Sequence, residues 1–104
     1  MSSIQSKSLE MGYTESEFRK TLIGQFTQNT SYTYTEFSKN HWLIYIEEKN
    51  EKVINTQISQ ALPRKIEMLV LPVLDVYFEF NQISAVEQKD FMNTFFRYFH
   101  KGGG

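Results

Sequence analysis

The chain opens with an apolar pattern of helical period. Four apolar residues recur at three- and four-residue spacing: Phe18, Leu22, Ile23 and Phe26. This spacing places them on one face of a helix. Thr14 and Glu17 precede them as a Thr-x-x-Glu capping box, in which each side chain accepts a hydrogen bond from a free backbone N–H. The pattern predicts a helix that starts after Thr14 and ends near Thr27.

From residue 31 the hydrophobic period falls from about 3.6 residues to about 2. β-Branched and aromatic residues dominate this part of the chain, which favours strands. Three strands are predicted: Tyr32 to Phe37, Trp42 to Glu47 and Val53 to Ser59. The second strand carries Trp42, Ile44 and Ile46 on one face and Leu43 and Tyr45 on the other. The third, which we expect to be half-exposed, carries Ile54, Thr56 and Ile58 on one side. Residues 38–40 and 48–51 supply the turns.

Two prolines interrupt the pattern that follows. Pro63 lacks the N–H that a strand ladder needs, so a fourth strand is expected to begin at Arg64 or Lys65. It leads into the longest apolar stretch, residues 66–78, which we interpret as core strand. Pro72 places a bulge, an edge or a corner inside this stretch. Beyond it a fifth strand is expected, with one apolar face formed by Leu74, Val76, Phe78 and Phe80.

A second helix is expected from Ala85 to about His100. Ser84 and Glu87 form its capping box, and five aromatic residues crowd its second half: Phe91, Phe95, Phe96, Tyr98 and Phe99. The short connections leave no room for parallel crossovers. The sequence therefore predicts an α+β two-layer sandwich, in which an antiparallel sheet of about five strands packs with an N-terminal and a C-terminal helix in the order α-β-β-β-β-β-α.

A chain of 104 residues is expected to form a single domain around one core. We predict a flexible leader over residues 1–11, one α+β domain over 12–101 and a flexible glycine tail over 102–104. The first ten residues lack the apolar stretch of a signal peptide, and residues 66–78 are shorter than the roughly 20 residues that cross a bilayer. The expected compartment is the cytoplasm.

Composition excludes several classes of function. Eleven basic and twelve acidic residues leave a net charge of −1, so no strong overall field attracts nucleic acid or an anionic membrane. The absence of cysteine excludes disulfide scaffolds, zinc fingers, iron–sulfur sites and thiol nucleophiles. The hydrophobic fraction of 40% is that of a folded globular chain.

No residues stand at catalytic or metal-binding spacing. His41 is expected in a solvated turn and His100 at a helix end, each without neighbouring ligands. Asp75 and Glu79 share a face of the fifth strand but lie about 13 Å apart by strand rise, too far for a carboxylate pair. We expect no catalytic residues, no metal and no cofactor, and the sequence does not support enzymatic activity.

Arg64, Lys65 and Arg97 form a candidate basic patch. Aromatic residues beside such a patch stack on single-stranded nucleic acid. The net charge is slightly acidic, however, and aromatic residues in strands usually serve cross-strand packing. Nucleic acid is therefore the less favoured partner.

The candidate interaction surface is the aromatic C-terminal helix, with Phe91, Phe95, Phe96, Tyr98 and Phe99. These rings cover more than a narrow stripe, so that a homodimer or protein partner would bury those that the sheet leaves exposed. A fully covered helix in an aromatic core is an open alternative. The sequence predicts a small non-enzymatic binding or adaptor module that uses this helix and a strand edge. The alternative is a domain for a small apolar ligand, or a small enzyme, with a pocket between sheet and helices.

The C-terminal third carries a resemblance. Its motif is Leu71-Pro72-x-Leu74-x-Val76-x-Phe78-x-Phe80, followed by Phe91-Met92 and by Arg97-Tyr98-Phe99-His100-Lys101-Gly102-Gly103-Gly104. It resembles the ending of short bacterial proteins of uncharacterised function that close on a basic residue and three glycines. The resemblance implies a bacterial protein with a native glycine tail and implies no activity. The order helix, strands, helix is also similar to that of secretion chaperones, which are dimeric binders of unfolded segments.

Overall fold

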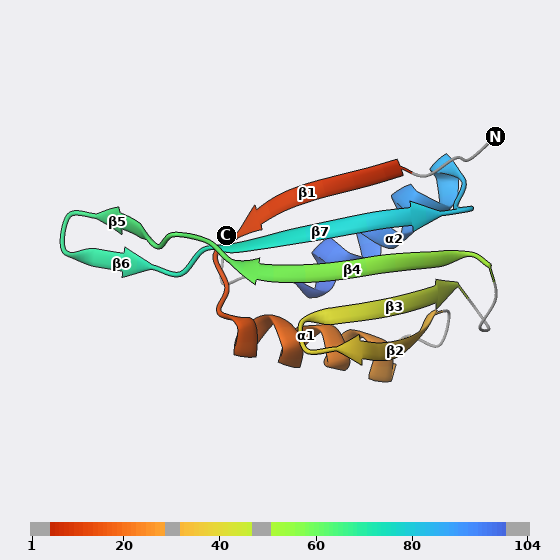
Figure 1. Ribbon diagram of the computed structural model, residues 1–104, viewed down its shortest axis with the longest axis horizontal. Coiled ribbons are helices and arrows are strands. Elements are labelled where there is room, and N and C mark those ends of the chain that lie inside the picture. Colours follow the sequence, from red (N-terminus) through yellow and green to blue (C-terminus); the bar gives the residue numbers. More distant parts are fainter. Residues whose placement is uncertain (1–4, 29–31, 47–50, 100–104) are drawn as a thin grey trace.

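The computed structural model describes residues 5–28, 32–46 and 51–99. Within them, five strands form one antiparallel sheet in the order β1-β7-β4-β3-β2, and two short strands form a separate hairpin (Figure 1). The elements in chain order are β1 (Gln5–Met11), α1 (Glu15–Gln28), β2 (Tyr32–Ser38), β3 (His41–Ile46), β4 (Val53–Gln60), β5 (Arg64–Ile66), β6 (Leu69–Leu71), β7 (Leu74–Asn81) and α2 (Ala85–Tyr98).

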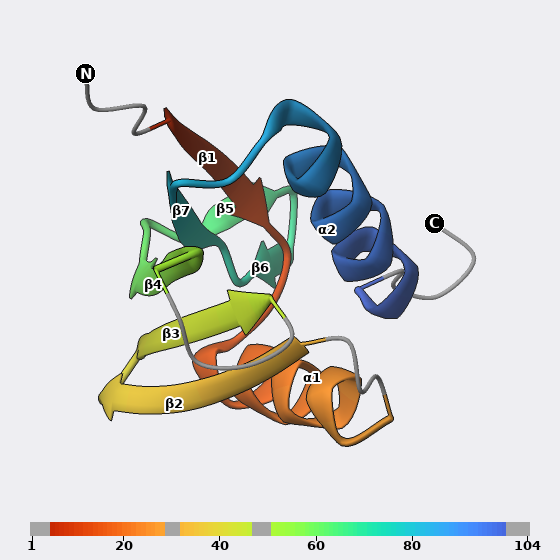
Figure 2. The same ribbon diagram turned by 90° about the vertical axis from the view of Figure 1, so that its right-hand side faces the viewer.

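Both helices pack against the same face of the twisted sheet, so the fold has two layers (Figure 2). α1 lies along the β2–β3 half of the sheet and α2 along the β7–β1 half (Figure 2). The predicted alternation of the strands is confirmed, because the following helix-facing side chains are buried: Trp42, Ile44, Ile54, Thr56, Ile58, Leu74, Val76, Phe78 and Phe80. The predicted α+β class, with an antiparallel five-stranded sheet and two helices, is therefore confirmed.

The ring of Phe95 joins both helices to the sheet. Its centroid lies 4.2 Å from that of Phe99, in a stacked arrangement, and 5.0 Å from that of Phe78 on β7, edge to face. On the other side it lies 6.1 Å from Phe18 of α1, whose ring is 5.9 Å from Trp42 of β3. Aromatic pairs at these separations stabilise a core beyond the area that they bury. A connected set of rings thus holds the two layers together.

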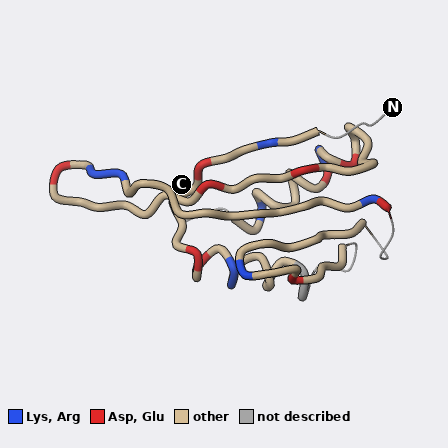
Figure 3. The backbone as a smooth tube through the Cα atoms, viewed as in Figure 1, with Lys and Arg blue, Asp and Glu red and all other residues tan. Residues whose placement is uncertain are grey.

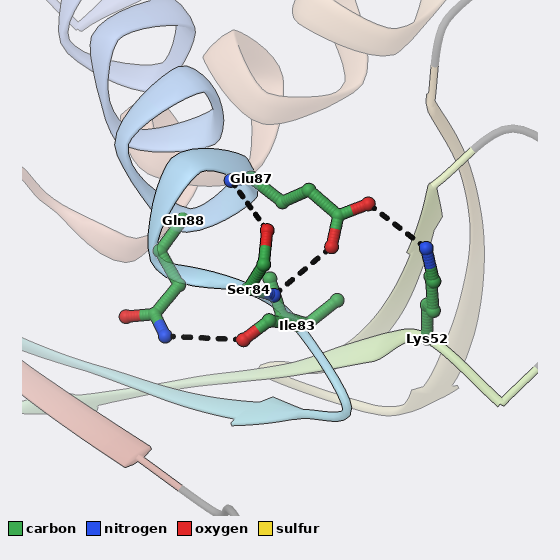
Figure 4. Close-up of polar contacts among 5 residues, drawn as sticks. All are labelled: Lys52, Ile83, Ser84, Glu87 and Gln88. Atoms are coloured by element: carbon green, nitrogen blue, oxygen red, sulfur yellow. Dashed lines mark hydrogen bonds and ion pairs between the residues drawn. The ribbon is translucent and has the colours of Figure 1, made fainter.

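Both helices begin with the capping boxes that the sequence predicts. The backbone N–H of Glu87 donates to Ser84 Oγ at 3.1 Å, and the N–H of Ser84 donates to Glu87 Oε1 at 2.9 Å (Figure 4). The other oxygen of Glu87 forms an ion pair with Lys52 of 3.0 Å. Thr14 and Glu17 make the same pair of capping bonds before α1. The hydrogen bond from the Ser84 N–H has the larger effect on the pKa of Glu87 and the Lys52 ammonium the smaller one, and both hold this pKa below its ordinary value.

The prediction of a flexible leader over residues 1–11 is wrong for Gln5–Met11. These residues form β1, an edge strand that pairs antiparallel with β7 along its whole length. Leu9 and Met11 pack against the core, and the remaining side chains of the strand are exposed. Backbone hydrogen bonds hold such an edge strand, so it lacks the hydrophobic alternation from which strands are predicted. A strand therefore precedes the first helix, and the predicted order of elements is corrected accordingly.

The predicted fourth strand is also corrected. Residues 64–71 form the hairpin β5–β6, which projects from one end of the sheet and does not join it in the part of the chain described (Figure 1). The apolar stretch 66–78, interpreted above as core strand, is buried core only within β7, from Leu74 onward, while Ile66 and residues 68–71 are exposed. The core was predicted on the rule that apolar side chains are buried, and the exposed apolar residues of this hairpin are exceptions to it.

The helices differ from prediction in detail. Ile23 is 36% exposed, whereas Gln25, a polar residue one turn after Leu22, is fully buried. A pattern built on apolar residues does not identify such a position. α2 ends at Tyr98. The predicted helix end at His100 and the predicted glycine tail over 102–104 lie outside the described residues.

The adjacent rings of Phe95 and Phe96 allow a matched test of the core. Phe95 is fully buried and Phe96 is 45% exposed. We expect Phe95→Ala to lower the free energy of unfolding by about 3–5 kcal/mol, and Phe96→Ala by about 1 kcal/mol or less. Urea unfolding of both variants at one low protein concentration measures the difference. Equal losses would show that Phe95 is not the centre of the core.

Glu87 makes stability depend on pH in a defined direction. Its pKa is lowered in the folded chain from an ordinary value of 4.5, so its contribution is complete above that value and is lost as the pH falls through the lowered pKa. We expect the free energy of unfolding of wild type to fall more steeply below pH 4.5 than that of Glu87→Gln. Urea unfolding across this range measures the two slopes. Parallel curves would contradict the assignment of the lowered pKa.

Candidate functional site

The hairpin β5–β6 presents an apolar face to solvent. Arg64 pairs with Leu71 and Ile66 with Leu69, and alternation places all four side chains on the same face. The exposed fractions are 50% for Ile66, 62% for Leu69 and 41% for Leu71, and Met68 in the turn is 95% exposed. Neighbouring exposed apolar side chains of this kind make the hairpin a candidate interaction surface.

Backbone chemistry holds the hairpin apart from the sheet. At the root, the N–H of Ala61 donates to the carbonyl of Val73 at 3.0 Å. Pro63 and Pro72 stand on the two sides of the root and have no N–H to extend the ladder of β4 or β7. At the tip, Glu67 has a φ of 56°, a positive value of the kind that tight two-residue hairpin turns require. The hairpin is therefore a distinct arm between two prolines.

The arm is tied only lightly to the body at its root. Arg64 Nη2 lies 3.4 Å from Glu10 Oε1 of β1, and both side chains are more than 60% exposed, at 64% and 63%. Exposed ion pairs contribute about 0–1 kcal/mol, and an isolated two-stranded hairpin is marginally stable in water. Contact with a partner would therefore stabilise the arm.

The structure separates the five rings of the candidate interface. Phe91 and Phe95 are fully buried and Phe99 is 5% exposed, so these three rings belong to the core and are not accessible to a partner in this fold. Tyr98 is half-buried against the same core. Phe96 alone among the five is exposed, at 45%. The open alternative of a covered helix holds for most of these rings, because α1 as well as the sheet encloses them.

Phe96 borders a groove between α2 and β1. The groove has a volume of about 380 Å³ and is lined in part by Phe80, Met92, Lys7 and Lys89. Phe80 and Met92 are buried and form its floor, whereas Lys7 and Lys89 are exposed. Within the described residues neither lysine forms an ion pair. The hollow therefore combines an apolar floor with two positive charges. It adjoins the aromatic helix α2 of the predicted interface, but the strand beside it, β1, is one that the sequence did not predict.

The candidate basic patch is divided between elements. Arg64 and Lys65 lie on β5 of the projecting arm, whereas Arg97 lies in the last turn of α2 on the covered side of the sheet (Figures 1 and 2). Arg64 is already paired with Glu10. This placement gives no support to a nucleic-acid surface, and nucleic acid remains the less favoured partner.

The face of the sheet opposite the helices carries a row of polar contacts. His41 Nε2 lies 3.2 Å from Asn55 Oδ1, and Asn55 Nδ2 donates to Glu79 Oε1 at 3.4 Å. The Tyr77 hydroxyl donates to Glu79 Oε2 at 3.4 Å. His41 is thus a half-buried strand residue rather than the solvated turn residue expected, since β3 begins at His41.

A second groove, of about 530 Å³, lies on this open face across β1, β7 and β4. Glu10 and Asp75 line it and stand opposite one another on neighbouring strands. Their oxygens and the neighbouring hydroxyl and amide groups suit the binding of polar groups. Among the residues that the structure describes, no three His, Cys, Asp or Glu side chains are grouped closely enough to hold a metal ion.

Comparison with known protein families, with curated proteins and with solved structures finds no match. The resemblance to short bacterial proteins therefore stays a prediction. A proposal of function has to be argued from the residues and their arrangement in this structure. Among the residues described, no helix has the length and apolar character to span a membrane.

The exposed apolar arm is a candidate interaction surface that the sequence analysis does not predict. Its signal was a pair of prolines, Pro63 and Pro72, on either side of a short apolar run. A run bounded in this way cannot continue a central ladder at either end. The residues between the prolines could therefore have been predicted as a separate hairpin with solvent on both sides.

Proposed function

We propose that this chain is a non-enzymatic protein-binding module that docks through the hairpin β5–β6. One observation carries the proposal: among the described residues, the largest group of neighbouring exposed apolar side chains belongs to this arm, with Ile66 at 50%, Met68 at 95%, Leu69 at 62%, Val70 at 58% and Leu71 at 41%. The apolar faces of the sheet and of both helices are largely used inside the core. The apolar surface that remains for a partner is therefore concentrated on the arm.

Burial of the arm supplies enough free energy for specific association. Full burial of an Ile, Leu or Met side chain stabilises by about 1.5–3 kcal/mol, and the apolar face with its tip offers four such side chains: Ile66, Met68, Leu69 and Leu71. Association costs about 4–15 kcal/mol in lost translational and rotational freedom. Ile66 and Leu71 are already about half-buried, so the gain that remains is less than four full burials. It is of the size needed to offset the lower part of this range, which suits a modest affinity.

The chemistry of the tip favours a protein partner over a lipid bilayer. Glu67 directly precedes Met68 at the turn, so a carboxylate would enter the hydrocarbon region together with the apolar tip. Charged groups in that region are costly. A protein surface, in contrast, can offer a cation to Glu67 and a hollow to Met68.

The alternative of a pocket between sheet and helices gains no support from the packing. Phe18, Phe78, Phe91 and Phe95 bring their rings together in that space, with centroids 5.0–6.2 Å apart in the pairs that include Phe95. Of the two grooves described above, one lies between α2 and the edge strand β1 and the other on the sheet face opposite the helices, and neither is lined by these four rings. A protein-binding role therefore accounts for more of the structure than a small-ligand or enzymatic role.

The test replaces the apolar face of the arm with serine. The triple variant Ile66→Ser/Leu69→Ser/Leu71→Ser is expected to keep the unfolding temperature of wild type, because these side chains are exposed. Wild type and the triple variant are each immobilised in a separate capture experiment. We expect wild type to capture a defined set of proteins from a bacterial lysate, or a second copy of itself. The variant should capture about tenfold less or lower still, since central apolar contacts dominate binding.

Phe37→Ser is the matched control. Phe37 is 67% exposed on β2, an edge strand away from the arm (Figure 1). Its replacement removes one exposed apolar side chain without touching the hairpin. Capture that is unchanged in the triple variant, or that is lost equally in the Phe37 variant, would contradict docking through the arm.

A further inference from the structure

The tip of the arm and the α2 groove have complementary chemistry. The tip pairs a carboxylate, Glu67, with a nearly fully exposed Met68. The groove pairs two ammonium groups, Lys7 and Lys89, with an apolar hollow bordered by Phe96. Within the described residues, none of the charges of Glu67, Lys7 and Lys89 takes part in an ion pair. Figure 3 shows acidic and basic residues together at the far end of the arm.

The two surfaces lie at opposite ends of the molecule. The arm projects from the end at which β7 begins, whereas the groove lies beside the end of β7, where α2 starts (Figure 1). β7 has eight residues and therefore separates the two ends by about 26 Å at a strand rise near 3.3 Å per residue. A chain cannot place its own tip in its own groove, so the complementary surfaces are available only to a second molecule.

We propose that the partner of the arm is a second copy of this chain, and that each copy inserts its Glu67–Met68 tip into the α2 groove of the other. This inference rests on the proposed function and specifies its partner. A two-fold arrangement of this kind makes two identical contacts and closes the assembly at two copies. Each contact places Met68 over the apolar floor and Glu67 between Lys7 and Lys89.

The arrangement explains three features that a lone chain leaves without a role. It covers the exposed Met68, it gives Glu67 an opposite charge, and it covers the exposed ring of Phe96. The groove volume of about 380 Å³ admits an aliphatic side chain together with the turn that carries it. Opposite charges at the rim guide the orientation of two copies more than they add affinity.

A charge-exchange experiment tests this pairing. Glu67→Lys makes tip and groove both positive, and Lys7→Glu/Lys89→Glu makes both negative, so each variant alone is expected to dimerise about tenfold more weakly than wild type or worse. An equimolar mixture restores opposite charges at both contacts of a mixed dimer. We expect native mass spectrometry to show that the mixture forms mixed dimers in preference to either homodimer. Lys20→Glu, an exposed charge on α1, is the matched control and should leave dimerisation unchanged.

The remaining outcomes separate this inference from the proposed function. Wild type that stays monomeric at all concentrations overturns the self-pairing, and arm-dependent capture of another protein would leave the proposed function standing. If the triple serine variant is monomeric and both charge variants dimerise like wild type, the groove is not the docking site. Docking through the arm would still stand. Association that is insensitive to the serine and charge variants alike overturns both.

Discussion

The fold depends on one constraint: a single sheet face must be covered by two short helices, and aromatic rings do most of the covering. Phe95 of α2 lies at the centre, in contact with Phe18 of α1 and Phe78 of β7. Because the rings link both helices to the sheet, neither helix is held by its own propensity alone. The same rings are buried in the core and therefore cannot also contact a partner.

The largest group of exposed apolar side chains among the described residues lies on the hairpin β5–β6, which Pro63 and Pro72 separate from the main sheet. The prolines remove the N–H groups through which the arm would join the ladder, so Ile66 and Leu69 project into solvent. An apolar arm of marginal stability and a groove with unpaired lysines at the opposite end of the described chain form a pair of complementary surfaces. In the proposed function, core and docking surface therefore belong to different elements, since Phe95 and the rings around it are buried.

Much of the fold could be predicted from local pattern, because its central elements obey simple rules. Thr14 and Ser84 begin helices through capping boxes, and β7 alternates buried and partly exposed side chains along its length. The edge strand β1 could not be predicted from hydrophobic alternation, since its residues are held by backbone bonds to β7. The arm was misassigned because its apolar residues read as core. Of the candidate interface, the sequence does not distinguish the exposed Phe96 from the buried Phe91, Phe95 and Phe99. Spacing along one helix does not reveal what a second helix covers.

Amide hydrogen exchange of the wild-type chain over a wide range of protein concentration tests the central claim most directly. The account predicts that the amides of β5 and β6 become more protected as concentration rises. The amides around Phe91 and Phe95 should exchange slowly and at the same rate at every concentration, because they belong to the core of each copy. Protection of the arm that does not change with concentration, together with protection of the second half of α2 that does, would contradict the account and return the interface to the aromatic helix.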